Sequence, residues 1–178
     1  MSDTSTTAPD LRAKELRSKL EAEPGVVIET FAEENGVTCR EVVEAMPASM
    51  IRFAKGDFGT TAPFVEVMGD VATWGDVTFI VHTEDGIFEF GGPIPPGSEA
   101  RNYYNLSGAK GLHGHLRAER CAGICFMERP FFGRLSASIL LFNRDGGIMF
   151  KIFVGRDDKR ELLPDQLAAF RKLADRMC

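Results

Sequence analysis

The sequence predicts an α+β protein, with helices first, then a mainly antiparallel β-sheet, and a C-terminal helix. Apolar residues recur at helical spacing up to Trp74 and again after Pro164. Between Asp76 and Val154 they form short alternating or continuous runs that are typical of strands. Turn residues separate these runs, so consecutive strands are expected to pair antiparallel.

Four helices are expected before the strands. In chain order they are a helix with Leu11, Leu16 and Leu20 that Pro24-Gly25 ends, a helix from Val27 to Asn35 that Gly36 ends, a helix that Thr38 caps and Pro47 ends, and a helix that Pro63 opens. Glu41 stands three residues after Thr38, which predicts a capping box. In the fourth helix the i, i+3, i+4, i+7 pattern consists of Phe64, Val67, Met68, Val71 and Trp74.

Seven strands follow in the prediction. They are Val77–His82, Ile87–Phe90, Asn102–Asn105, Leu112–Arg117, Ala122–Glu128, Ser136–Phe142 and Ile148–Val154. Asp145-Gly146-Gly147 predicts a hairpin between the last two, because these residues adopt positive φ readily. The last helix is expected from Pro164 to Arg176, with Leu167, Phe170, Leu173 and Ala174 on its apolar face.

Composition is that of an ordinary globular protein. Of 178 residues, 44% are hydrophobic and 26% charged, with a net charge of −5. The acidic balance disfavours nucleic acid as a partner. Residues 1–10, rich in Ser, Thr and Asp, are expected to form a disordered tail, and 11–178 a single domain whose residues 11–60 are a helical portion packed on the sheet.

Several features predict a cytoplasmic protein. Its four cysteines are too sparse for a disulfide framework, which favours a reducing compartment. The N-terminus has no signal-peptide pattern. No apolar run reaches the roughly 20 residues that a membrane span requires, so no membrane insertion is expected.

The three histidines are the candidates for chemistry, and all lie in predicted strands. His82 ends its strand on the face of Thr78 and Ile80. Alternation places His113, His115 and Arg117 on one face of another strand, where Gly111 and Gly114 remove side-chain bulk. A flat ligand flanked by imidazoles fits such a strand, although most strand histidines are only satisfied polar residues.

Other kinds of site fit these residues less well. His-x-His is also compatible with zinc, but no third ligand has suitable spacing. Cys121 and Cys125 are expected to share a strand face but to lie too far apart for joint ligation, so core packing is the better interpretation. The segment 31–46 has the shape of a helix-turn-helix, yet its second helix offers Arg40 against Glu41 and Glu44, which favours a structural helical hairpin.

An ordered set of segments resembles a bacterial family of intracellular haem carriers called HutX or ChuX. The resemblance extends from about Pro24 to Leu173. It rests on Trp74-Gly75-Asp76-Val77, Val81-His82-Thr83, Tyr104-Asn105-Leu106, Gly114-His115-Leu116, the segment 136–143 and the segment 149–157.

The resemblance implies one half of the duplicated HemS/ChuS-type haem-utilisation fold, and a homodimer. It implies a carrier, not an enzyme, that binds haem (iron protoporphyrin IX) in the cytosol and passes it to a haem-degrading enzyme. His82 and His115 are the implied iron ligands, whereas His113 is outside the family pattern. Enzymatic haem degradation on the same scaffold and a haem-responsive helix-turn-helix regulator are the alternatives.

Two further roles follow if haem is the ligand. Apolar walls would bury the porphyrin, with candidates Phe79, Ile80, Phe88, Phe90, Tyr103 and Leu116. A cation would pair with the haem propionates, with candidates Arg101, Lys110 and Arg117. From these sets we expect Tyr103 and Arg117 to contact haem beside the two histidines.

Overall fold

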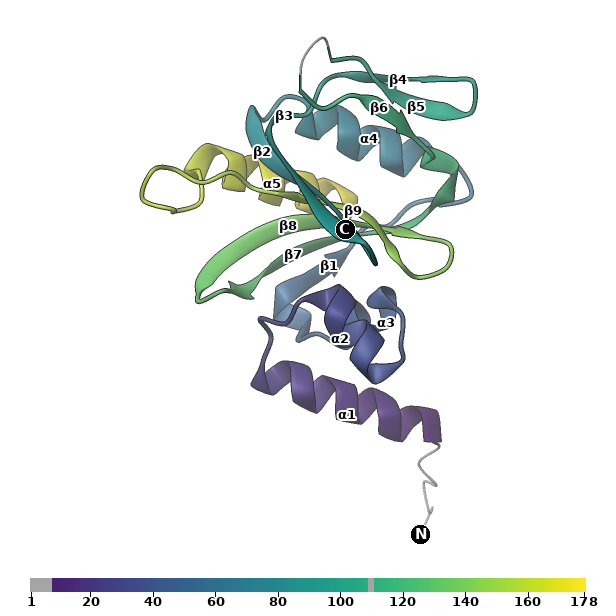
Figure 1. The fold of residues 1–178 in the computed structure, drawn as a ribbon, viewed down its shortest axis with the longest axis vertical. Coiled ribbons are helices and arrows are strands. Elements are labelled where there is room, and N and C mark those ends of the chain that lie inside the picture. Colours follow the sequence, from purple (N-terminus) through teal and green to yellow (C-terminus); the bar gives the residue numbers. More distant parts are fainter. Residues whose placement is uncertain (1–7, 109–110) are drawn as a thin grey trace.

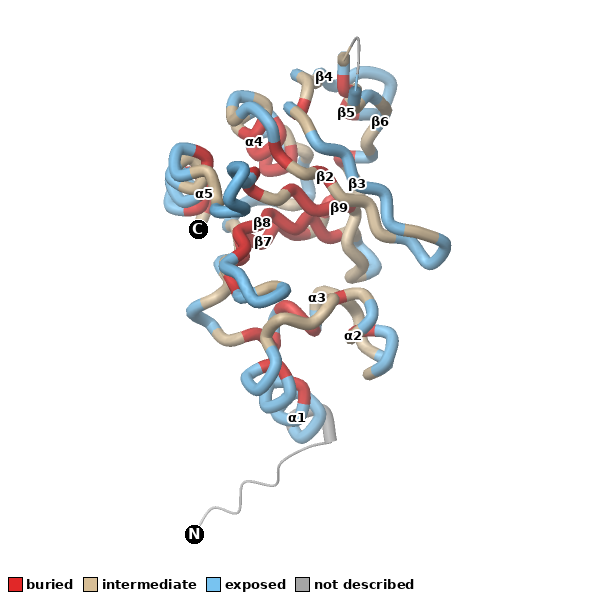
Figure 2. The backbone as a smooth tube through the Cα atoms, turned by 60° about the vertical axis from the view of Figure 1, so that its left-hand side comes forward, coloured by how far each residue is buried: buried red, intermediate tan, exposed pale blue. Residues whose placement is uncertain are grey.

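A six-stranded antiparallel sheet forms the centre of the computed structural model, which describes residues 8–108 and 111–178 (Figure 1). In sheet order its strands are β1 (Ile51–Phe53), β7 (Cys121–Phe131), β8 (Arg134–Asn143), β9 (Ile148–Phe153), β2 (Asp76–Thr83) and β3 (Gly86–Pro93). The buried residues concentrate on β7, β8 and β9, whereas β3 is exposed at one edge (Figure 2). The expected hairpin joins β8 to β9, and Gly146 adopts a φ of 82° there.

Three helices cover one face of this sheet. They are α1 (Ala8–Ala22), α2 (Ile28–Asn35) and α3 (Cys39–Glu44). Leu20, Ile28 and Val43 pack against Met127 and Leu140 of the sheet and exclude water from this side. Thr38 caps α3 as expected, and Glu41 completes the capping box.

Two helices cover the opposite face, α4 (Ala62–Val71) and α5 (Pro164–Met177). Their apolar faces meet the side chains that alternate with those on the α1–α3 side, including Phe126 and Ile139. Each helix begins with a proline in its first turn, where the missing N–H costs nothing. The sequence patterns for α4 and α5 are therefore confirmed.

A second sheet of three strands covers α4 (Figure 1). Its strands are β4 (Gly97–Ala100), β5 (Tyr103–Leu106) and β6 (Gly114–Leu116). The Tyr104 ring packs edge-on against Phe64 of α4, with the centroids 5.4 Å apart. A Cβ at Gly97 would lie 2.1 Å from the Tyr104 ring, so only glycine fits this position of β4.

The structure corrects several expectations. Ile51–Phe53, placed in the helical portion 11–60, forms β1, and Gly97–Ala100 forms the unexpected β4. Strand β6 is only Gly114–Leu116, so His113 and Arg117 flank it instead of belonging to it. The expected tail 1–10 is only partly covered, since residues 1–7 lie outside the described residues and α1 begins at Ala8.

The two strand cysteines also differ from expectation. Both are buried, as predicted, but Cys121 packs on the α4–α5 side and Cys125 on the α1–α3 side. A register shift between Cys121 and Gly123 inserts one extra residue and reverses the alternation.

Two short 3₁₀ turns, Ala48–Met50 and Ala118–Arg120, complete the regular structure in the described part. No helix there has both the length and the apolar character needed to cross a membrane.

Candidate functional site

His115 on β6 is exposed, and its imidazole ring contacts two neighbouring side chains, Asn105 and Tyr103. Its Nδ1 lies 2.6 Å from Oδ1 of Asn105, the residue directly opposite on β5. The Tyr103 ring meets it edge-on, with centroids 5.8 Å apart and planes at 62°. Because Nδ1 is engaged, Nε2 is the nitrogen of His115 that can bind a metal ion.

Tyr103 and Arg117 lie together at the rim of an open cavity of about 560 Å³. Arg117 donates to Glu119 Oε1 at 2.9 Å, and both side chains are exposed. Glu99 also lines this cavity. The bond to Glu119 uses Nε of Arg117, so the terminal N–H groups of the guanidinium could pair with a ligand carboxylate.

His82 lies in a different environment, between the six-stranded sheet and α2. Its Nδ1 is 3.4 Å from Oε2 of Glu29. Lys151 binds the other oxygen of that carboxylate at 2.5 Å. Lys151 pairs with Ile80 in the β2–β9 register, so the predicted face shared by Ile80 and His82 is confirmed.

The polar groups around Glu29 are largely buried. Arg129, Ser138 and Lys151 are each at most 9% exposed. Burial lowers the pKa of Arg129 to about 10, opposed by the nearby Glu29 charge. Glu29 Oε2 is buried and accepts no hydrogen bond from any described residue. A buried carboxylate oxygen without a hydrogen-bond donor is uncommon. Nδ1 of His82, 3.4 Å from this oxygen, is a ring nitrogen close enough to approach it.

The structure does not bring the two candidate ligands together within one chain. No hydrogen bond, ion pair or ring contact links His82 to His115 among the described residues. His82 contacts α2, whereas His115 belongs to the small sheet over α4. His113 lies before β6, with its Nδ1 3.0 Å from Gly111 O.

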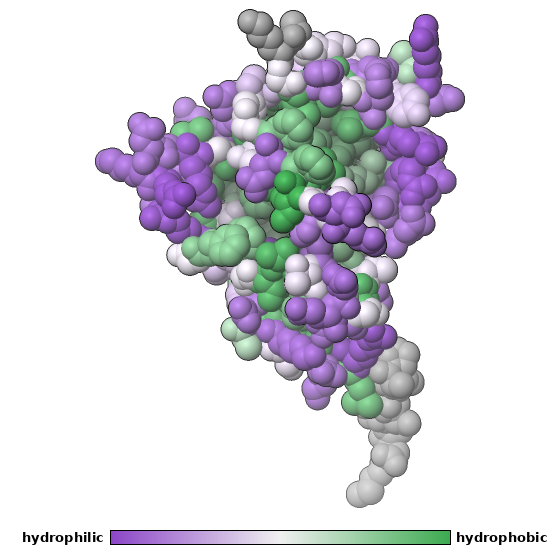
Figure 3. Space-filling model, in the orientation of Figure 1, coloured by the Kyte–Doolittle hydropathy of each residue, from purple (hydrophilic) through white to green (hydrophobic). Residues whose placement is uncertain are grey.

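The predicted apolar wall divides into two groups. Phe79 is buried in the core, where it stacks on Phe150 at 4.7 Å, so it is not available to a ligand. Phe88 and Phe90 of the edge strand and Tyr103 are exposed. Apolar surface gathers in the middle of the face shown in Figure 3, between the small sheet and the helices α1–α3. Lys110, one of the predicted propionate partners, lies outside the described residues.

Sequence reasoning missed the partners of both histidines. Asn105 becomes adjacent to His115 only through the pairing of β5 with β6, and seven residues separate those strands. Glu29 and Lys151 are 122 residues apart in sequence. The capping pattern and strand alternation carry no signal for contacts of this range.

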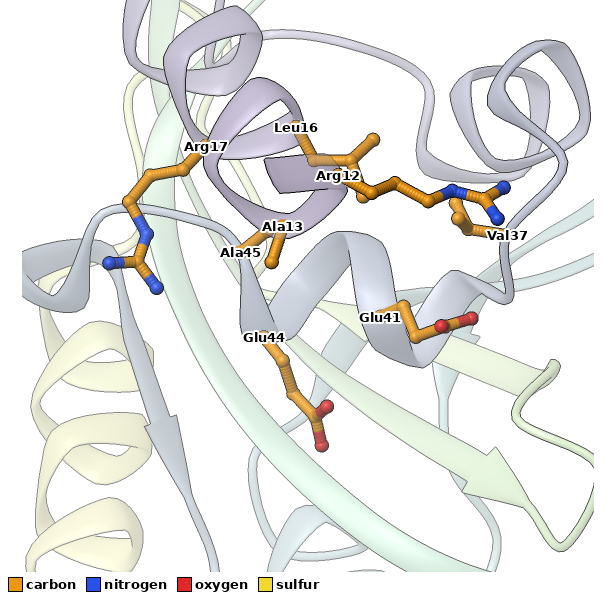
Figure 4. Close-up of a pocket in the computed structure, with 8 residues that line it drawn as sticks. All are labelled: Arg12, Ala13, Leu16, Arg17, Val37, Glu41, Glu44 and Ala45. Carbon is orange, nitrogen blue, oxygen red and sulfur yellow. The ribbon is translucent and has the colours of Figure 1, made fainter. Parts of the chain in front are cut away.

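A larger cavity, of about 590 Å³, lies between α1 and α3 and contains none of the histidines (Figure 4). Arg12 in its lining donates to the carbonyls of Asn35 and Gly36, and Glu41 accepts from Thr38. Arg40 on the same helix pairs with Glu44 at 2.8 Å. The Arg12 contacts join α1 to the C-terminal end of α2, and the other two stabilise α3 itself, as in a structural helical hairpin.

Comparison with known proteins identifies relatives over most of the chain. The profile of a family described as haem utilisation ChuX/HutX matches residues 59–173. A Vibrio cholerae protein named intracellular heme transport protein HutX is 38% identical over 155 residues, which cover 86% of this chain and 78% of the relative.

Solved structures of other proteins share the fold of this chain. A protein from Erwinia carotovora is 42% identical, with a TM-score of 0.85 over 92% of this chain and 98% of the other. The heme binding protein ChuX is also 42% identical, and its structure has a TM-score of 0.79 over 90% of this chain and 97% of the other. Apo-PhuS from Pseudomonas aeruginosa, 14% identical with a TM-score of 0.72, matches the whole chain with 50% of its own length. The predicted α+β fold, equivalent to half of a larger protein, is thus confirmed.

Proposed function

Because the chain belongs to the ChuX/HutX haem-utilisation family, we propose that it is a cytoplasmic carrier that binds haem and passes it to a haem-degrading enzyme. The structural observation that best supports this proposal is the environment of His115. This residue is an exposed imidazole whose Nδ1 is engaged by Asn105, which leaves Nε2 for iron, and an aromatic ring stands beside it.

His115, His82, Tyr103 and Arg117 are the residues that we propose contact haem. The donor set fits: neutral imidazole is a common axial ligand of haem iron, and an aromatic side chain can pack on the porphyrin. Arg117 bonds Glu119 through Nε, so its terminal N–H groups would pair with a propionate. An exposed ion pair of this kind contributes little to binding, which suits a site that must release its ligand.

A homodimer is part of the proposal. Strand β3 is a sheet edge whose Ile87, Phe88 and Phe90 are 57%, 56% and 43% exposed. An apolar edge strand of this kind is a liability unless another chain covers it. Since His82 and His115 do not meet within one chain, pairing of two copies is also a route by which both could approach one haem. Small-angle scattering that gives the mass of one protomer at micromolar concentration would reject the dimer.

A haem titration followed by absorbance tests the carrier function. We expect saturation near one haem per chain, with a changed Soret band in His82→Ala and in His115→Ala. His113→Ala is the matched control, because His113 is exposed and lies two residues from His115, yet it is outside the proposed site. Binding no tighter than that of an unrelated acidic protein would show that only the fold is shared.

A second experiment separates a carrier from a haem-degrading enzyme. Haem-loaded protein is mixed with a reductant and oxygen, and the products are examined. If the protein is a carrier, its Soret band decays no faster than that of free haem under the same conditions. A tetrapyrrole product formed in stoichiometric amount would instead identify an enzyme.

A further inference from the structure

The amide group of Asn105 has a fixed orientation. Its Nδ2 lies 3.2, 3.1 and 3.1 Å from the carbonyl oxygens of Ser98, Ala100 and Tyr103. Carbonyl oxygens only accept hydrogen bonds, so the NH₂ must occupy this side of the amide. Oδ1 therefore faces the other way, toward Nδ1 of His115.

The backbone around Asn105 is built to hold that amide. Ala100 and Tyr103 are the paired residues that flank a two-residue hairpin turn between β4 and β5. The turn residues Arg101 and Asn102 have φ of 54° and 65°, as a type I′ turn requires. Asn105 bonds the carbonyls on both sides of this turn, so the turn and the amide fix each other.

The orientation of Asn105 determines the protonation pattern of His115. Since Oδ1 is an acceptor, Nδ1 of the neutral ring must carry the proton, and the lone pair is on Nε2. Without such a partner a neutral histidine in water favours the opposite tautomer, with its proton on Nε2. That tautomer cannot bind iron through Nε2.

We propose that Asn105 is a positioning residue that selects the tautomer of His115 and holds its ring ready to bind a metal ion through Nε2. The inference deepens the proposed function and takes His115 as an iron ligand from it. A residue that hydrogen-bonds the other ring nitrogen of a metal-binding histidine, the one that does not bind the metal, typically contributes about 10- to 100-fold to metal affinity. The partner here is a neutral amide instead of a carboxylate, so it orients the ring without adding negative charge to it.

Nitrogen-15 NMR of the haem-free protein, at a pH where the imidazoles are neutral, tests the tautomer directly. We expect His115 to be protonated on Nδ1 in the wild type and to shift toward protonation on Nε2 in Asn105→Ala. His113 is the internal reference, because its Nδ1 faces Gly111 O and is independent of Asn105. Asn143→Ala is the matched control, because it removes two hydrogen bonds between a side-chain amide and backbone N–H groups, but in the β8–β9 turn.

Asn105→Asp separates positioning from simple loss of stability. A carboxylate still accepts from His115 Nδ1 but cannot donate to the three carbonyls, so the hairpin weakens while the tautomer is retained. In haem titrations we expect about a tenfold loss of affinity in Asn105→Ala and a much smaller loss in Asn143→Ala.

The outcomes distinguish this inference from the proposed function. A wild-type His115 protonated on Nε2, or a tautomer unchanged in Asn105→Ala, overturns the positioning role, and the wild-type spectrum decides even if a variant does not fold. A tautomer that shifts as expected upholds the role of Asn105. If His115→Ala then binds haem as the wild type does, it is the ligand assignment in the proposed function that fails.

Discussion

Glu29 on α2 and Lys151 on β9 form a 2.5 Å ion pair in which the side chains are only 16% and 11% exposed. The pair joins the helical layer to the sheet, and Arg129 and His82 lie close to the same carboxylate. Removal of one member of such a pair leaves a largely buried charge without its partner. We expect Glu29→Ala to lower the free energy of unfolding by about 3 kcal/mol, measured by urea titration.

Two controls isolate the buried charge. Glu66→Ala removes an exposed carboxylate that pairs with Arg176, and it should cost less than about 1 kcal/mol. Glu29→Leu combined with Lys151→Met replaces both charges by apolar groups and should recover most of the loss. If Glu29→Ala costs no more than Glu66→Ala, the pair is not a structural connection between the layers.

The capping box of α3 gives a second prediction. The Thr38 hydroxyl accepts from the Glu41 N–H at 3.2 Å, and the Thr38 N–H donates to Glu41 Oε2 at 2.7 Å. Thr38→Ala removes the cap and should cost about 1 kcal/mol in urea unfolding. Thr38→Ser keeps the hydroxyl and should stay near wild type, whereas an equal loss in both variants would assign the effect to the threonine methyl group.

Glu41 also predicts a pH dependence. The hydrogen bonds from Thr38 lower the pKa of Glu41 below its ordinary value of 4.5. A carboxyl whose pKa is lower in the folded state stabilises the fold fully above its unfolded pKa, and this contribution is lost as the pH falls through the folded pKa. The stability difference between wild type and Glu41→Gln should therefore be constant above about pH 5 and shrink in more acidic solution. A difference independent of pH would contradict this linkage.

Local patterns in the sequence predict the helices well and the long-range contacts poorly. Thr38 and Glu41 predict α3 because the whole capping box lies within four residues. Strand β1 has only three residues, and its register with β7 pairs Phe53 with Cys125, far along the chain. Nothing local to Ile51–Phe53 distinguishes it from a loop, so it was missed.

The candidate site shows the same division. The resemblance implies His82 and His115 as iron ligands, but the surroundings of these two residues depend on tertiary structure. The orientation of the His115 ring depends on Asn105 and on a two-residue turn whose positive φ values do not come from glycine. Similarly, one extra residue near Cys121 reverses strand alternation, which a period-two pattern cannot anticipate.

Cysteine reactivity provides a fourth prediction. Burial raises the pKa of the Cys121 thiol to about 11 and that of Cys125 to about 12, so neither forms much thiolate at neutral pH. Cys39 and Cys178 are only partly buried. A thiol reagent should label two cysteines quickly in native protein and all four in denaturant, and peptide mapping should assign the fast pair to Cys39 and Cys178. Rapid native labelling of Cys125 would contradict the packing of α1–α3 on the sheet.

Tyr103 and Tyr104 are adjacent in sequence but face opposite sides of the small sheet, which allows a matched pair of variants. Tyr103 is 41% exposed and meets the ring of His115, whereas Tyr104 is 3% exposed and packs on Phe64. Tyr103→Ala should leave the unfolding free energy within about 1 kcal/mol of wild type and weaken haem binding about tenfold, since an aromatic contact contributes about 1 kcal/mol beyond its buried area. Tyr104→Ala should instead lose about 3 kcal/mol or more of stability, because it leaves a cavity in the core.

Tyr103→Phe keeps the ring and should bind haem nearly as the wild type does. Wild-type haem affinity in Tyr103→Ala would remove Tyr103 from the site, and a loss in Tyr103→Phe equal to that in Tyr103→Ala would assign its role to the hydroxyl group instead of the ring.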